Sequence, residues 1–222
     1  SIHDGGEKIV LGTRIAAGGG IEDGLKVIDL LARHPSTAQF IATKLARRLV
    51  ADDPPKSLVG KAAAVFRQSD GDIPAVLRAM VESEEFFAPT EYRGKIKKPL
   101  EYVASALRLT GAETQITHQL LRYLARMGEP LFLAQPPTGH PDLAASWISA
   151  DMLLTRMNFA ADLVSNRLPG SRVTKETTGN IEQLAQLIAP HSLSASTRLA
   201  LDETSGADAV ALLLAAPEFQ RR

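Results

Sequence analysis

Apolar residues recur at steps of three and four from Ile21 to Leu214, the spacing that places them on one face of an α-helix. The residues before Ile21 follow another pattern. Residues 7–11 and 14–17 flank Gly12-Thr13, which is typical of a short β-hairpin. The pattern therefore predicts an all-α protein, an irregular multi-helix bundle with a short amino-terminal β-hairpin.

Proline and capping residues divide this periodic stretch into about nine helices. Pro35 and Pro99 suit the first position of a helix, and Asp72 and Ser149 are typical N-caps. Gly128 can supply the left-handed residue that ends a helix.

Two further helix starts are expected from polar residues. One helix should follow Thr114, and Asn180 with Gln183 resembles a capping box at the start of another.

The apolar helix faces predict which residues form the core. Leu25, Ile28 and Leu31 make one stripe in the first helix. A common core is expected from Phe40, Ile41, Leu45, Leu49, Phe66, Leu77, Leu107, Leu124 and Met157.

Two stretches interrupt the helical pattern. Residues 128–149 contain four prolines, and irregular loops of that length are uncommon in compact domains unless they carry a function. The polar stretch that follows Leu168 reads as a linker. We therefore expect a main helical body with the hairpin at 1–168, a linker at 169–179, and a carboxy-terminal helical appendage at 180–222 that packs on the body.

Charge and composition exclude several classes of function. The chain has 25 basic and 25 acidic residues, so its net charge gives no general attraction for nucleic acid or anionic membranes. It has no cysteine, which excludes disulfides and thiolate metal sites. No apolar run reaches the ~18–20 residues of a membrane span. We expect neither a nucleic-acid partner nor a membrane span.

The chain shows no familiar catalytic pattern. It has no H-E-x-x-H metal spacing and no G-x-S-x-G nucleophile elbow. His34 stands at a helix boundary, where a structural role is expected. No catalytic residue, metal site or cofactor is therefore predicted.

The long loop is the best candidate for a binding site. It contains Glu129, His140 and the chain's only tryptophan, Trp147, and Arg156 follows about two helical turns later. A tryptophan beside prolines and a few polar groups is typical of a face that binds a sugar or a peptide. The alternative is that Trp147 and Phe132 only pin an irregular loop onto the bundle.

Several peptide blocks, taken in order, resemble one known family. They are HPSTAQFIATKLARRLVADDPP at 34–55, FRQSDGDIPAVLRAMVESEEF at 66–86, KIKKPLEYVASALRLTGA at 95–112, MGEPLFLAQPPTGHPDLAASWI at 127–148 and LLAAPEFQRR at 213–222. On these blocks the chain is similar to bacterial domain-of-unknown-function family 1800. It departs from the family pattern at Glu129, where glutamine is usual, and at His140, where tryptophan is usual.

The resemblance implies a helical fold and an exported, extracytoplasmic protein, but no established activity. Family members are roughly twice as long, so the chain is expected to be the carboxy-terminal half of a longer protein. The favoured interpretation is a non-catalytic helical scaffold or binding module of an exported bacterial protein. Its partner would be another exported protein or its own amino-terminal half. The alternative is a hydrolase or carbohydrate-active enzyme whose site in the 128–149 loop is completed by that half.

The expected linker gives a first testable prediction. If residues 170–179 are mobile, limited proteolysis should cut the chain there before it cuts elsewhere. Mass spectrometry of the first fragments locates the cut. Early cleavage at other places, with this stretch resistant, would contradict the linker.

Overall fold

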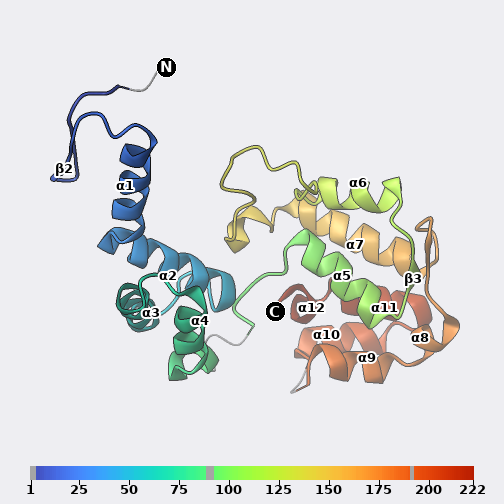
Figure 1. The fold of residues 1–222 in the computed structure, drawn as a ribbon. Helices are drawn as coiled ribbons and strands as arrows, with labels where there is room; N and C mark the ends of the chain where they lie inside the picture. The colour runs from blue at the N-terminus through green and yellow to red at the C-terminus, as the bar shows by residue number, and fades with distance from the viewer. Residues whose placement is uncertain (1–3, 89–92, 191–192) are drawn as a thin grey trace. The chain divides into compact units, whose positions relative to one another are not determined.

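The computed structural model describes residues 4–88, 93–190 and 193–222 (Figure 1). Its internal contacts divide the chain into two compact units, Ser1–Tyr92 and Arg93–Arg222. The described secondary structure is helical apart from two two-stranded antiparallel sheets and one isolated bridge. The all-α prediction is confirmed.

The amino-terminal hairpin forms where the sequence predicts it. Strand β1 (Lys8–Val10) pairs with β2 (Thr13–Ile15), and Lys8 lies opposite Ile15. The two residues between the strands, Leu11 and Gly12, both have positive φ, at 48° and 79°. A two-residue turn of this kind matches the natural twist of the strands that it joins.

The first unit continues with four helices and a short 3-10 turn. They are α1 (Ile21–Ala32), α2 (Pro35–Leu49), α3 (Lys56–Gln68), α4 (Ile73–Val81) and η1 (Glu84–Phe87). Helix α3 packs against both α2 and α4 (Figure 1). The core of this unit lies between these three helices.

Helix α2 buries alanines rather than its larger apolar residues. Ala38, Ala42 and Ala46 follow one another at steps of four and are fully buried, because that spacing places them on one face. Phe40 is 61% exposed and Leu49 is 40% exposed, so the prediction that both lie in the core was wrong. The small side chains leave room for α3 to pack closely.

The predicted apolar stripe of α1 was wrong as well. Leu25, Ile28 and Leu31 are all exposed, and the buried residue of this helix is Asp23. Lys8 Nζ lies 4.0 Å from Asp23 Oδ2, which links the hairpin to the start of α1.

The second unit contains most of the helices. They are α5 (Pro99–Leu109), α6 (His118–Arg126), η2 (Ala144–Ser146), α7 (Ala150–Val164), α8 (Lys175–Gly179), α9 (Ile181–Ile188), α10 (Ala195–Asp202), α11 (Gly206–Ala215) and α12 (Pro217–Gln220). A second sheet pairs β3 (Glu113–Thr114) with β4 (Ser171–Arg172). Helix α11 packs against α7, α9 and α10 (Figure 1). In the described part of the chain, no helix is long and apolar enough to cross a membrane.

Aromatic rings hold the second core together. Tyr102 contacts Phe159 and Phe219 edge to face, with ring centroids 5.9 and 5.6 Å apart, and Tyr123 contacts Phe159 at 5.4 Å. Such pairs add to the free energy gained by burial alone. Leu124 is buried here as predicted, but Met157 is exposed. The predicted common core is thus two separate cores, one in each unit.

The caps at Asp72 and Ser149 are confirmed. Asp72 Oδ1 accepts a hydrogen bond from Ala75 N at 3.4 Å, and Ser149 Oγ accepts one from Met152 N at 3.2 Å. His34 also has a structural role, since its Nδ1 accepts from Ser36 N at the start of α2.

The two other predicted helix starts need correction. Thr114 belongs to β3, and α6 begins later, because Thr117 Oγ1 accepts from Leu120 N. Asn180 precedes α9 as expected, but its side chain donates to Gln183 instead of capping the helix backbone.

Residues 169–179, where the sequence predicts a linker, belong to the second unit. Ser171 and Val173 are buried in this stretch. Asn166 holds Val173 on both sides: its Oδ1 accepts from Val173 N at 2.7 Å, and its Nδ2 donates to Val173 O at 3.1 Å. The linker itself stays a prediction for the proteolysis experiment.

The alanine face of α2 generates a second prediction. Replacing Ala42 with leucine adds bulk where the packing has no room, so Ala42→Leu should lower the free energy of unfolding by about 1–3 kcal/mol or prevent folding. Phe40→Ala removes a much larger but exposed side chain and should cost less than ~1 kcal/mol. Urea unfolding measures both. A larger loss for Phe40→Ala than for Ala42→Leu would show that the buried face is the other one.

Candidate functional site

The long loop leaves α6 through a glycine that could not be replaced without strain. Gly128 has φ 95°, and Glu129 N donates to Leu124 O at 2.9 Å, which ends the helix. A Cβ at position 128 would lie 2.8 Å from Met152 Cε and 3.7 Å from Trp147 Cζ3. The start of the loop is therefore packed against its own end.

Glu129 binds a backbone N–H group at the start of α5. Its Oε2 accepts a hydrogen bond from Leu100 N at 2.8 Å. The first backbone N–H groups of a helix lack partners within the helix, and a carboxylate there also interacts favourably with the helix dipole. Glu129 thus joins the loop to α5.

Trp147 and His140 lie against each other inside the loop. Their rings meet edge to face with centroids 6.1 Å apart. Trp147 is only 2% exposed, and its Nε1 donates to Pro141 O at 3.2 Å. His140 Nε2 lies 3.2 Å from Pro130 O, so the histidine bridges two parts of the loop.

Two lysines before α5 bind the same aspartate of the loop. Lys98 Nζ lies 2.5 Å from Asp142 Oδ1, and Lys95 Nζ donates to Asp142 O at 2.9 Å. Lys98 also lies over the Trp147 ring, 5.9 Å from its centroid. These contacts hold the middle of the loop next to the segment that leads into α5.

Arg156 is the largest fully buried side chain of the chain's described part, at 1% exposure. Its Nη1 donates to Gln220 Oε1 and its Nη2 to Lys97 O, both at 2.7 Å. The guanidinium also lies 5.1 Å from the centroid of the Tyr102 ring. Burial lowers the pKa of Arg156, and the negative charge of Glu129 acts in the opposite direction.

The structure therefore brings Glu129, His140 and Trp147 together as parts of one packed loop, whereas Arg156 bonds to residues outside the loop. The hydrogen bonds of Glu129, His140 and Trp147 hold the loop in place, as expected if the loop is pinned to the bundle. Direct contact of these four residues with a ligand stays a prediction.

An apolar groove lies beside this loop, along α6. Its volume is about 510 Å³. It is lined by Ile116, His118, Leu121, Arg122, Ala125, Pro130, Leu131, Phe132 and Leu133. Ile116 is 82% exposed and Phe132 is fully exposed, so the groove has a prominent apolar rim.

Phe132 has a strained backbone as well as an exposed ring. Leu133 N donates to Pro130 O at 3.2 Å and closes a four-residue turn, in which Phe132 has φ 60°. Glycine or asparagine normally occupies such a position, because other side chains clash with the backbone there. The sequence pattern predicts Phe132 only as an anchor of the loop and does not indicate Ile116 or Leu133 as site residues. The sequence did carry a signal, because an apolar run at 131–134 follows the helix-ending Gly128 after two intervening residues.

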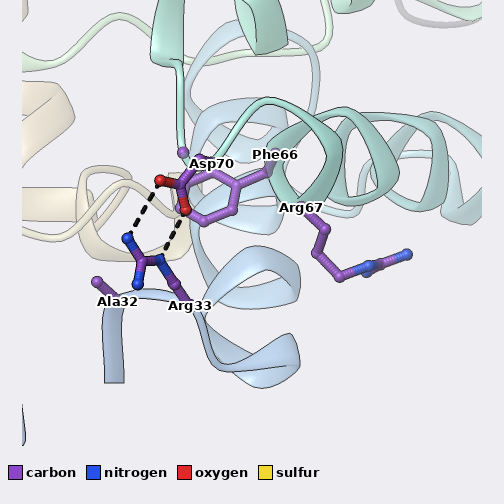
Figure 2. A pocket seen from close by; sticks show the side chains of 6 residues that line it. Ala32, Arg33, Phe66, Arg67 and Asp70 are labelled. Atoms are coloured by element: carbon purple, nitrogen blue, oxygen red, sulfur yellow. Dashed lines mark hydrogen bonds and ion pairs between the residues drawn. The ribbon is translucent and has the colours of Figure 1, made fainter. Parts of the chain in front are cut away.

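A smaller cavity of about 150 Å³ lies in the first unit (Figure 2). Figure 2 shows the Asp70 carboxylate facing the Arg33 guanidinium, with Nε–Oδ1 and Nη2–Oδ2 distances of 2.9 and 3.3 Å. The hydrogen bond from Arg33 lowers the pKa of Asp70. Asp29 also pairs with Arg33 at 2.7 Å. Arg33 thus forms ion pairs with both aspartates, and its pair with Asp70 joins the end of α1 to the turn after α3.

Within the described residues, no three histidine, aspartate or glutamate side chains are grouped so that they could hold a metal ion. The fold and the loop define a mainly helical protein with two units, in which a proline-rich loop is part of the second unit and packs on its helices.

The chain belongs to the family described as protein of unknown function (DUF1800), whose model matches residues 1–221. A search of curated proteins and a search of solved structures each gave no match.

Arg156 generates the third prediction. Arg156→Ala leaves a cavity and two buried acceptors, on Gln220 and Lys97, without their donor. We expect it to lower the free energy of unfolding by about 3–5 kcal/mol. Arg126→Ala, an exposed arginine on α6, should change it by less than ~0.5 kcal/mol. Equal effects in urea unfolding at neutral pH would contradict a structural role for Arg156.

Proposed function

We propose that this protein is a non-catalytic helical binding module, and that its groove along α6 binds an apolar peptide segment of a partner protein. The observation that carries the proposal is Phe132, a fully exposed aromatic side chain held on a strained turn at the rim of that groove. Backbone strain is concentrated at functional sites, where it places a side chain for binding.

The charges around the groove specify the peptide further. His118 and Arg122 line it together with apolar residues, and no carboxylate is among its lining side chains. A peptide with an aspartate or glutamate next to its apolar residues would complement both features. Burial of Ile116, Phe132 and Leu133 would supply most of the free energy of binding.

The location of the protein is part of the same proposal. Resemblance to an often exported bacterial family supports an extracytoplasmic partner, which would be another exported protein or an amino-terminal region of the same protein. The packed state of the loop supports a rigid scaffold for the groove, since Glu129, His140 and Trp147 fix its position.

Phe132→Gly separates binding from stability and gives the fourth prediction. Glycine relieves the strain at φ 60°, and the lost ring contributes little buried area, so the free energy of unfolding should change by less than ~1 kcal/mol. Peptides selected from a displayed library on the wild-type protein should contain acidic and apolar residues together. They should bind Phe132→Gly at least ~10-fold more weakly, the effect of losing one aromatic contact at an interface.

Leu199→Ala serves as the matched control, because Leu199 is also an exposed apolar residue of the second unit but lies on α10. The selected peptides should bind this variant as they bind the wild type. Peptides that bind Phe132→Gly with unchanged affinity would contradict the proposal, and so would a selection that enriches no peptide.

A further inference from the structure

A second cavity of the same unit, about 360 Å³ in volume, is lined by four basic side chains. Arg93 and Lys97 come from the segment before α5, Arg108 from α5, and Arg221 from the end of the chain. The chain as a whole has no net charge. The concentration of positive charge is therefore a local property of this cavity.

The single carboxylate in the cavity lining, Glu218, is held by other groups. Its Oε1 accepts from Ser194 N at 2.8 Å, and both of its oxygens lie within 3.2 Å of Thr197 Oγ1. Burial alone would raise the pKa of Glu218, but these hydrogen bonds outweigh it and lower the pKa. Four cations and one carboxylate leave the lining with a net charge of 4 − 1 = +3.

Three of the basic side chains have no ion-pair partner among the described residues. Lys97, Arg108 and Arg221 each lack a carboxylate within ion-pair distance, whereas Arg93 donates to Glu218 O at 3.2 Å. Lys97 Nζ instead lies 3.7 Å from the centroid of the Phe219 ring.

The ammonium group of Lys97 is in an unfavourable environment. Burial, together with the charges of Arg93 and Arg156, lowers the pKa of Lys97 to about 8, although Glu101 acts in the opposite direction. An anion placed in the cavity would offset both the lost hydration and the repulsion between the cations.

Apart from the hydroxyl of Ser105, the rest of the cavity wall is apolar. Leu109, Ile188 and Phe219 line it, and Leu187 adds an exposed side chain at its edge. A small inorganic anion would leave this surface unused. A ligand with a charged group at one end and an apolar group at the other would contact both kinds of wall.

We propose that this cavity binds a phosphomonoester with an apolar substituent. The phosphate carries close to two negative charges at neutral pH and several acceptor oxygens. One arginine guanidinium group can donate two parallel hydrogen bonds to two phosphate oxygens, and a lysine ammonium group adds a point charge. The net charge of the lining suits a dianion better than a monoanion.

Titration calorimetry on the whole 222-residue chain tests the proposal with phenyl phosphate, inorganic phosphate, benzoate and phenol as probes. Phenyl phosphate should bind at least ~10-fold more tightly than each of the others, since it alone has both the dianion and the ring. The affinity should fall as salt is added, because the attraction is between charges. Binding of phenyl phosphate no tighter than that of phenol would overturn the proposal.

Arg108→Gln and Lys97→Met locate the site. Each removes one charge from the lining and should weaken binding of phenyl phosphate about 10-fold or more. Arg108 is exposed, so this variant keeps the fold even if Lys97→Met does not. The control is Arg198→Gln, an exposed arginine on α10 that lies outside the cavity lining. Equal affinity of Arg108→Gln and Arg198→Gln would place the bound phosphate elsewhere and overturn the assignment.

A lipid head group could supply the same chemistry as a soluble ester. Sedimentation with phosphatidylcholine vesicles that contain phosphatidic acid distinguishes the two sources. Vesicle binding that phenyl phosphate displaces assigns the lipid to this cavity, and absence of vesicle binding assigns a soluble ester. Vesicle binding that is unaffected by phenyl phosphate and by Arg108→Gln counts against the proposed site.

Discussion

The second unit depends on one buried cation. Arg156 extends from α7 and binds Lys97 O, before α5, and Gln220 Oε1, at the end of α12. Tyr102 of α5 completes the arrangement, because its hydroxyl donates to Arg156 O at 3.0 Å. A buried guanidinium depends on such partners, because taking a charge out of water is costly unless hydrogen bonds compensate for the lost hydration. Correct packing therefore requires that α7 contact both the segment before α5 and the end of the chain.

The same cation also sets the environment of the basic cavity. Lys97 N donates to Gln220 O at 2.8 Å, so the two residues that Arg156 binds also bind each other. Lys97, one member of this pair, lines the cavity, and so does Arg221, which follows Gln220 in the sequence. Burial and the charge of Arg93 lower the pKa of Lys97, and the charge of Arg156 adds to their effect. A residue that stabilises the fold thus also makes the cavity more attractive to an anion.

The sequence predicts the helices better than their buried faces. Periodicity, prolines and caps locate most helix boundaries, because these signals depend on neighbours within one turn. Which face is buried depends on the partner helix. In α2 the alanines at 38, 42 and 46 permit the closest approach of α3, and the larger Phe40 stays outside. A pattern that ranks residues by hydrophobicity alone selects the wrong face here. The division into two cores follows from contacts between distant residues, which no local pattern contains.

The loop at 128–149 shows that local sequence patterns also fail to predict which residues of the candidate site are exposed. Its length and prolines predict an ordered, unusual segment, but they do not distinguish Trp147 from Phe132. The structure separates them: the Trp147 N–H has a partner on Pro141 O inside the loop, and Phe132 stands on a turn whose φ turns it out to solvent. An exposed ring on a strained turn gains from a partner, whereas a buried and bonded ring has little left to gain. Within this loop, the exposed and strained Phe132 is therefore a better candidate for the proposed peptide contact than the buried Trp147.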